Sequence, residues 1–412
     1  MEAFEGYTYI EGGVCAAKGF LANGLNAGIN RDPNKNDMGM IYSETLCQAA
    51  GVFTQNKVKG APVIVCQEHL AKTNGQAYGV IVNSKNANTC NFDGYDIAQR
   101  ACELMAEQLH IDPMKVLVAS TGVIGQRLSI QPFETHMEAL VKGLSKDGNH
   151  KVVNAIMTTD TIEKEVAVEF MIQGKSCRLG GMAKGSGMIH PNMATTLNFI
   201  TGDVCVAQPL VQKALREVVK VTYNCLSIDG DQSTNDTCIV MTNGLAGNPM
   251  IDKEDADYEI FKKALYIVMM NLTKMLAADG EGATKMLECT CSQAPDLQTA
   301  ITIAKSVIRS PLIKCAMYGE DANWGRILCA IGYAEADFDI EKVDVTLRSE
   351  QGEVQVCRDG FGVEFSEELA AKVLSADEIY IDIDLKQGDA QAKAWGCDLT
   401  YDYVKINGDY RT

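Results

Sequence analysis

The stretch Lys184-Gly-Ser-Gly-Met-Ile-His-Pro-Asn-Met-Ala-Thr-Thr-Leu-Asn-Phe-Ile-Thr-Gly-Asp203 carries the strongest signal in this 412-residue chain. Its Met-Ala-Thr junction at 193–195 predicts a place where the chain cuts itself. A threonine hydroxyl is a weak nucleophile at neutral pH, and the segment supplies no neighbouring carboxylate as a base. Cutting the Ala194–Thr195 bond would give Thr195 its own α-amino group, whose pKa of about 7.7–8.0 suits a general base.

The same residues also fit an ordinary turn. Gly185, Gly187 and Pro191 are typical turn residues, and the apolar run at 197–200 that follows them is typical of a buried strand. In this interpretation Thr195 is only a β-branched residue that favours extended backbone. The segment by itself leaves both interpretations open.

The twenty residues resemble the cleavage segment of the ornithine acetyltransferase family, the bifunctional glutamate N-acetyltransferases of arginine biosynthesis. Further segments resemble that family's signatures, in its order and over essentially the whole chain: 51–62, 82–88, 120–125, 157–161, 227–237, 279–285, 318–326 and 403–412. The departures are Cys15 and Ala17, where a threonine and a proline are expected, and Gly408, where alanine is commoner. None of them touches the proposed chemistry.

The resemblance implies an α/β (α+β) fold. Its first part is an αββα-layered, self-cleaving domain of the N-terminal-nucleophile type, and a smaller α+β domain follows. We place the boundary so that the domains span 1–285 and 286–412. The cut would produce fragments 1–194 and 195–412, which both contribute strands to the layered domain.

Periodicity predicts helices and strands in mixed order. Apolar residues recur at helical spacing from Asp96, which we expect to cap its helix, and from Pro209 and Asp257. The last of these helices is expected to run to about Leu276. Strands are predicted at 63–65, 79–82, 115–119, 166–170, 238–241, 343–347 and 379–385. Several of them alternate in polarity, which favours antiparallel or mixed sheets.

Composition excludes several classes of protein. The net charge is −17 and no dense block of Lys and Arg occurs, which argues against nucleic-acid binding and against an anionic membrane surface. The first twenty residues lack the pattern of a signal peptide, and no run approaches the roughly 18 apolar residues of a membrane span. We therefore expect a cytoplasmic enzyme that accepts a cationic small substrate.

Fifteen cysteines invite a disulfide or metal interpretation, but they are scattered singly through apolar stretches. We expect the following to be small core residues of a reduced protein: Cys47, Cys66, Cys102, Cys225, Cys238 and Cys329. Cys289 and Cys291 lie close together, yet without a partner pair or nearby histidines they do not make a zinc site. No metal is expected. Only His190 lies beside the cleavage motif, and its role stays open.

The resemblance also implies site residues. Thr121 and Gly122, directly after the predicted strand at 115–119, match the pair that stabilises the oxyanion of acyl transfer. Lys184 is expected to bind the substrate carboxylate, although a solvated lysine in a Gly-Ser loop would look the same in sequence. Glu281, between two glycines, is expected to lie near the substrate amine or the Thr195 amine. The implied binding set is completed by Thr158, Asn407 and Thr412.

The implied activity is acetyl transfer from N2-acetyl-L-ornithine to L-glutamate through an ester on Thr195. No cofactor is required, and the use of acetyl-CoA as a further donor stays open. The family resemblance also implies a heterotetramer of two copies of each fragment. One alternative is an aminopeptidase or amidase of the same self-cleaving superfamily, in which water takes the acyl group. A binding scaffold is disfavoured because no repeat of 20–50 residues occurs.

Overall fold

The computed structural model describes residues 1–190 and 196–409. Its first sheet has nine strands in the order β1-β6-β7-β8-β10-β3-β4-β5, with β2 paired to β3. These strands are β1 (Tyr7–Ile10), β2 (Phe20–Leu25), β3 (Met38–Phe53), β4 (Gln76–Asn83), β5 (Val116–Ser120), β6 (Lys164–Ile172), β7 (Lys175–Lys184), β8 (Leu197–Gly202) and β10 (Thr237–Thr242).

A second sheet of seven strands has the order β14-β13-β12-β15-β11-β16-β9. Its strands are β9 (Leu226–Ser227), β11 (Met286–Ala294), β12 (Asp344–Ser349), β13 (Gly352–Arg358), β14 (Phe361–Gly362), β15 (Glu378–Asp384) and β16 (Ala390–Cys397). The helices are α1 (Ala61–Lys72), α2 (Gly94–Leu109), α3 (Gln131–Lys142), α4 (Asn149–Ile156), α5 (Gln208–Lys220), α6 (Ala256–Ala278), α7 (Leu297–Ile308), α8 (Pro311–Tyr318), α9 (Trp324–Gly332), α10 (Glu367–Leu374) and α11 (Tyr401–Asp409).

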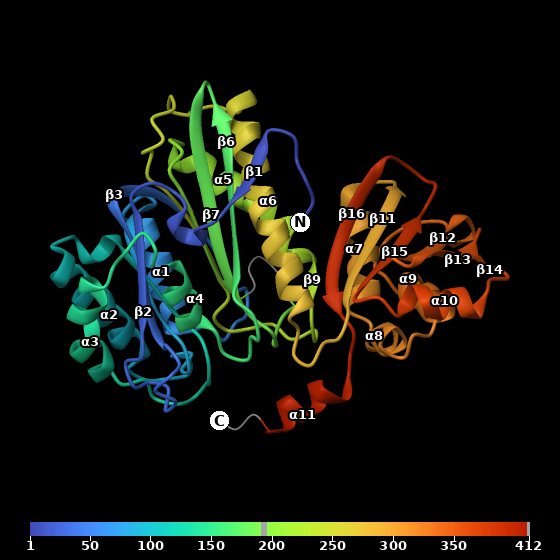
Figure 1. The fold of residues 1–412 in the computed structure, drawn as a ribbon, viewed down its shortest axis with the longest axis horizontal. Coiled ribbons are helices and arrows are strands. Elements are labelled where there is room, and N and C mark those ends of the chain that lie inside the picture. The colour runs from blue at the N-terminus through green and yellow to red at the C-terminus, as the bar shows by residue number, and fades with distance from the viewer. Residues whose placement is uncertain (191–195, 410–412) are drawn as a thin grey trace.

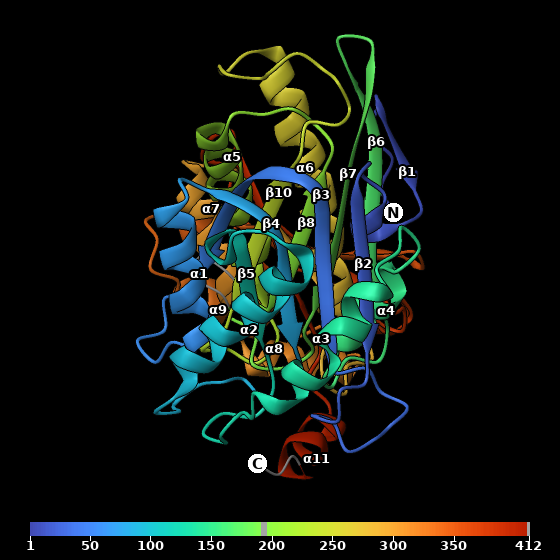
Figure 2. The same ribbon diagram turned by 90° about the vertical axis from the view of Figure 1, so that its left-hand side faces the viewer.

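The long strand β3 divides the first sheet into two layers. Its first half pairs with β2 and β4 and its last six residues pair with β10, with a register shift against β4 between Tyr42 and Cys47. Such irregularities bend a strand and increase its twist. The layer that contains β2 and β3 therefore lies against the layer that contains β6 and β7, with α1–α3 outside the former and α5 and α6 outside the latter (Figures 1 and 2). This is the predicted αββα order.

Strands β8 and β10 bury both faces. Leu197 and Phe199 belong to the core shared with β2–β5, whereas Ile200 belongs to the core under α5 and α6. In β10, Ile239 belongs to the core shared with β2–β5, and Cys238 belongs to the core under α5 and α6. Because side chains alternate along a strand, a middle layer covered on both faces must be apolar almost throughout. All six residues of β8 are accordingly buried.

The proposed fragments interleave in this sheet. Strand β8 pairs antiparallel with β7, so that Lys184 lies opposite Leu197, and β10 lies between β8 and β3. Two strands from the fragment that begins at 195 are thus inserted between strands of the fragment that ends at 194. A cut between them would leave both pieces hydrogen-bonded in one sheet.

Helix α6 lies between the two sheets, packing on β6 and β7 with one side and on β11 and β16 with the other (Figure 1). Helix α7 covers β11 and β16. Strand β11 begins directly after our proposed boundary at residue 285. The two-residue strand β9, which pairs with β16, comes from before that boundary.

Most of the predicted elements are confirmed. The helix from Pro209 is α5, and the helix over 257–276 is α6, which begins after Asp255 as its capping residue. The helix that we expected Asp96 to cap is α2, but it begins at Gly94, so Asp96 lies inside its first turn. Six strands are confirmed, as β4, β5, β6, β10, β12 and β15.

The predicted strand at 63–65 is wrong, because these residues lie inside helix α1. A short apolar run does not distinguish a strand from a buried helix segment. Pro62, in the first turn of α1, has a φ angle already suited to a helix start. The expected burial of Cys329 is also wrong, since this side chain is exposed on α9, while the other five cysteines named as core residues are buried.

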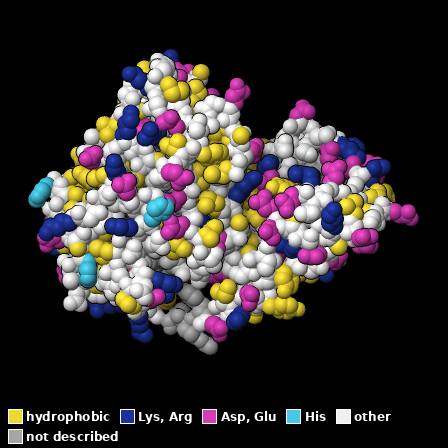
Figure 3. All heavy atoms as spheres, in the orientation of Figure 1, with side chains coloured by type: hydrophobic (Ala, Val, Ile, Leu, Met, Phe, Trp, Pro, Cys, Tyr) yellow, Lys and Arg dark blue, Asp and Glu magenta, His cyan; other side chains and the backbone are white. Residues whose placement is uncertain are grey.

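Acidic and basic side chains are scattered over the face in Figure 3, with acidic ones more numerous on its right-hand part. In the described residues, no helix is both long and apolar enough to cross a membrane.

Candidate active site

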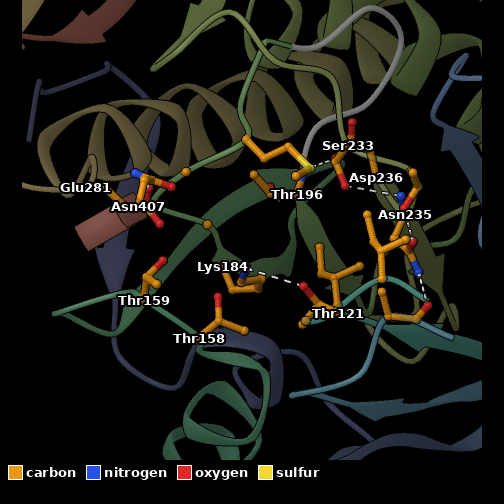
Figure 4. A pocket seen from close by; sticks show the side chains of 18 residues that line it. Thr121, Thr158, Thr159, Lys184, Thr196, Ser233, Asn235, Asp236, Glu281 and Asn407 are labelled. Carbon is orange, nitrogen blue, oxygen red and sulfur yellow. Dashed lines mark hydrogen bonds between the residues drawn. The ribbon is translucent and has the colours of Figure 1, made fainter. Parts of the chain in front are cut away.

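One cavity of about 150 Å³ collects six of the residues that the sequence predicts for the site (Figure 4). They come from segments far apart in the chain: the end of β5, the loop before β6, the end of β7, the turn after α6, and α11. The six are Thr121, Gly122, Thr158, Lys184, Glu281 and Asn407. Their roles stay predictions, but their meeting in one cavity depends on the fold and on no local pattern.

Three further predicted residues, Ala194, Thr195 and Thr412, lie outside the described residues. Thr196 lines the cavity, and its backbone N–H donates to the Asp236 carboxylate at 2.7 Å. The φ angle of Thr196 is +69°. Backbone of this kind costs a β-branched residue on the order of 1–3 kcal/mol. The cavity therefore adjoins the predicted cleavage site, beside a strained residue.

Thr121 and Gly122, the predicted oxyanion pair, directly follow β5, which is the position expected from the sequence. The Thr121 N–H donates to the Asn83 carbonyl at 3.0 Å, so this amide is not free for a ligand. Thr121 lines the cavity, and its hydroxyl, which accepts from the Lys184 Nζ, is the polar group left to act as a donor. Gly122 has a φ of +128°, and a Cβ there would lie 2.2 Å from the carbonyl carbon of Lys85. Only glycine fits at this position. Among the described residues, the Gly122 N–H has no hydrogen-bond partner, so it can serve as a donor.

Lys184 ends strand β7 and is only 7% exposed, so it is not a solvated loop residue. Its Nζ donates to the Thr121 hydroxyl at 3.5 Å and lies 4.0 Å from a carboxylate oxygen of Asp160. Burial lowers the pKa of Lys184, and the negative charge of Asp160 opposes that effect. This arrangement places a cation in the cavity, where it can bind a carboxylate.

Glu281 faces Asn407 at the other side of the cavity (Figure 4). The Asn407 Nδ2 donates to the Glu281 carboxylate at 2.8 Å, and the Glu281 N–H donates to the Ser186 carbonyl at 2.9 Å. A Cβ at Gly187 would lie 2.2 Å from the same carboxylate, so glycine is what allows this approach. A negative group therefore faces the cavity opposite the ammonium of Lys184.

His190 does not line this cavity. Its Nδ1 lies 3.0 Å from the Ser227 hydroxyl, and the side chain faces a second cavity that Lys305 and Arg309 also line. Burial and these two cations lower the pKa of His190 to about 4, so its ring is neutral near pH 7. The structure gives no support for a contact between His190 and substrate.

The described residues hold one group of side chains with the spacing of metal ligands: His150, Glu163 and Glu165, whose ligand atoms lie within 4.8 Å of one another. The His150 Nδ1 already lies 2.6 Å from the Glu163 carboxylate. None of the three lines the predicted active site, and we assign them no metal.

The sequence model of the ArgJ family matches residues 21–412. The chain belongs to the ArgJ family. It is 48% identical over 394 residues to arginine biosynthesis bifunctional protein ArgJ 1 of Clostridium acetobutylicum, covering 95% of this chain and 96% of the relative. It is also 48% identical over 404 residues to the ArgJ protein of Caldanaerobacter subterraneus subsp. tengcongensis, covering 98% and 99%.

A solved structure of ornithine acetyltransferase from Mycobacterium tuberculosis, complexed with ornithine, is 34% identical to this ArgJ-family chain. The match covers 46% of this chain and 100% of that chain, with a TM-score of 0.42.

Sequence reasoning missed several residues of this ArgJ-family site. Asp160 and Asp279 form buried ion pairs beside the cavity, and Asp236 lines it. Burial raises the pKa of Asp236 well above its usual value. All three lie inside the segments 157–161, 227–237 and 279–285, which resemble the family's signatures. The sequence did not indicate that these carboxylates are buried at the site.

Proposed function

We propose that this chain transfers the acetyl group of N2-acetyl-L-ornithine to L-glutamate through an ester on Thr195. Its family supports arginine biosynthesis as the context, because its relatives carry that name. The observation that carries the proposal is the cavity itself. The Lys184 ammonium and the Glu281 carboxylate line it together with Thr196, which directly follows the predicted nucleophile Thr195.

In the first half-reaction, the Thr195 hydroxyl attacks the acetyl carbonyl carbon, and the α-amino group of Thr195 takes the hydroxyl proton. The carbonyl oxygen becomes an oxyanion, which accepts hydrogen bonds from the Thr121 hydroxyl and the Gly122 N–H. Loss of one such donor typically costs about 3–4 kcal/mol of barrier. The C–N bond then breaks, ornithine leaves with the proton on its amine, and the acetyl group stays on Thr195.

In the second half-reaction, the amine of glutamate attacks the acetyl ester. The same two donors stabilise the second oxyanion. The C–O bond to Thr195 breaks, and the threonine oxygen regains a proton that the attacking amine releases. The products are N-acetylglutamate and the free N-terminal threonine.

Substrate recognition follows from the charges that line the cavity. Acetyl-ornithine and glutamate share an α-carboxylate, for which we propose Lys184 as the partner. We propose that Glu281, held by Asn407, faces a positively charged amine, and that Thr158, which lines the cavity beside Lys184, contributes a hydroxyl (Figure 4). We propose that Thr412 completes the binding set.

The enzyme is active only after self-cleavage, in this proposal. The chain cuts between Ala194 and Thr195, and the fragments 1–194 and 195–412 stay together through the shared sheet. We further propose a heterotetramer of two copies of each fragment, in the cytoplasm. A reducing compartment fits the fifteen free cysteines.

The names of the relatives also describe them as bifunctional. We therefore propose acetyl-CoA as a second acetyl donor to the same threonine. Purified enzyme should then form N-acetylglutamate from acetyl-CoA and glutamate without acetyl-ornithine. The Thr195→Ala variant should not.

The central test measures ornithine release from acetyl-ornithine with and without glutamate. Addition of glutamate should accelerate release many-fold and yield one N-acetylglutamate per ornithine. Equal rates with free acetate as the product would instead identify an amidase, in which water takes the acyl group. Absence of both products from protein that has been cut would refute the proposal.

A further inference from the structure

Four charged side chains form a buried cluster behind the cavity. The Lys164 Nζ lies 2.8 Å from a carboxylate oxygen of Asp160 and 2.5 Å from one of Asp279. Lys184 adds the second cation, 4.0 Å from the other oxygen of Asp160. The side chains of Lys164 and Asp160 are fully buried and that of Asp279 is 5% exposed. The two carboxylates and two ammonium groups balance in charge.

Asp160 is shared unequally between the two lysines. It lies closer to Lys164, which is enclosed, than to Lys184, which faces the cavity. Lys164 makes the close contact with Asp160 but shares its charge with Asp279, and Lys184 contributes the remaining positive charge from a longer distance. The Lys184 ammonium stays attracted to Asp160, yet it is not neutralised by a close contact and can still bind an anion.

The cluster also holds the backbone that surrounds the cavity. Asp160 accepts the N–H of Gly185 at 2.6 Å and the N–H of Thr158 at 3.0 Å. It thereby joins the loop before β6 to the end of β7. These two segments carry the predicted substrate contacts Thr158 and Lys184.

Asp279 extends these contacts to the turn after α6, the segment that carries Glu281. Its carboxylate accepts hydrogen bonds from both the N–H and the hydroxyl of Thr161, and its backbone carbonyl accepts the Ser186 hydroxyl at 2.6 Å. Ser186 in turn accepts the N–H of Glu281 through its carbonyl. The positions of Lys184 and Glu281 are thus coupled through a continuous set of buried contacts.

We propose that Asp160, supported by Lys164 and Asp279, is a positioning residue of the substrate site, and that it fixes the Lys184 ammonium at the distance from the Glu281 carboxylate that an amino-acid substrate requires. The inference rests on the proposed function, because it concerns the same substrates. Asp160 touches no substrate. It acts through Lys184, and this distinguishes it from a residue that only stabilises the fold.

The test is a double-mutant cycle with Asp160→Asn and Lys184→Met, measured by the acetyl-exchange assay. Asparagine keeps the size of aspartate but removes the charge that attracts both lysines. We expect Asp160→Asn to raise the KM for acetyl-ornithine roughly ten- to a hundred-fold, with a much smaller fall in kcat. In the Lys184→Met background, the same substitution should change KM by less than about two-fold, because the residue it acts through is gone.

A multiplicative effect in the double variant, or an unchanged KM in the single variant, would overturn the proposal. Failure of the wild-type enzyme to exchange acetyl groups would instead overturn the proposed function, before any variant is compared. Intact mass and thermal unfolding establish that each variant is cut and folded.

Asp203→Asn is the matched control. This carboxylate is also fully buried, and it accepts the N–H groups of Lys18 and Arg178 at the opposite end of β7. It should change stability but not KM. If Asp160→Asn does not fold, the same cycle is made with Asp279→Asn, which removes the other partner of Lys164. The same loss of effect in the Lys184→Met background is expected, and additive effects there would overturn the proposal.

Discussion

Replacement of Lys184 by methionine tests the substrate site most directly. Methionine has a similar length and no charge, so the substitution removes the proposed carboxylate partner and leaves the packing nearly unchanged. Asp160 keeps its contact with Lys164 at 2.8 Å and its two backbone N–H donors. Asp160 therefore keeps a partner, but the cluster loses one of its two positive charges, so the variant should be less stable than wild type while it still folds and is cut.

The expected magnitude follows from the burial of Lys184. A hydrogen bond to a charged group contributes about 1.5–3 kcal/mol, which corresponds to roughly a 10- to 150-fold change in KM. Because Lys184 is only 7% exposed, solvent screens the interaction little, and the upper half of that range is expected. The kcat should fall far less, since the acetyl carbonyl reacts at Thr195.

The assay measures initial rates of ornithine release while acetyl-ornithine and glutamate are varied separately. Both KM values should rise, because both substrates carry an α-carboxylate. Lys285→Met is the matched control, since Lys285 is 8% exposed, pairs with Glu320 and backbone carbonyls, and does not line the cavity. An unchanged KM in cut, folded Lys184→Met protein would refute our assignment of Lys184.

Four further predictions follow from the fold and the site. Intact-mass analysis should find fragments 1–194 and 195–412 co-eluting, because β8 and β10 lie between strands of the first fragment. The Thr195→Ala variant should stay uncut and inactive, whereas Thr195→Ser should retain some cutting. Initial rates should show ping-pong kinetics with acetyl mass added to the 195–412 fragment after a rapid quench, and intersecting double-reciprocal lines without that mass would mean direct transfer. Gly187→Ala should fold but raise KM, because its Cβ would displace the Glu281 carboxylate, whereas Gly408→Ala, with nothing within 4 Å, should behave as wild type. Although burial alone would raise it, the pKa of Asp160 is lowered to about 2 by Lys184 and Lys164. A carboxylate with a lowered pKa stabilises the fold above about pH 4, and this stabilisation is lost as the pH falls towards 2. In urea unfolding, the free energy of unfolding of wild type should therefore fall by about 2 kcal/mol more than that of Asp160→Asn between pH 4 and pH 2.

Much of the fold was predictable from local patterns. Strands such as β5, β6 and β15 show the apolar or alternating sequences of buried and half-buried strands, and Pro209 marks the start of α5. Local pattern failed at residues 63–65, where an apolar run of three residues suits a strand and a helix equally. The prediction that Cys329 is buried was wrong for a related reason, because an apolar neighbourhood in sequence does not indicate which side of a helix faces solvent.

For the site, the sequence by itself determined the family and named six residues that meet in one cavity, whereas the nucleophile in the Met-Ala-Thr junction stays a prediction. It did not indicate that the Thr121 amide is used by the sheet, which depends on the pairing with Asn83. Hydrogen-bond partners of this kind are set by neighbouring strands that lie far away in the chain.

Only the tertiary structure decided how charge is arranged behind the cavity. Asp160 and Lys164 are four residues apart, but Asp279 reaches them from 115 residues beyond Lys164, through the turn that follows α6. Sequence shows four charged residues that would each be unremarkable on a surface. Burial makes them significant, because ions removed from water must be paired, and the pairing that results holds Lys184 and Glu281 in place.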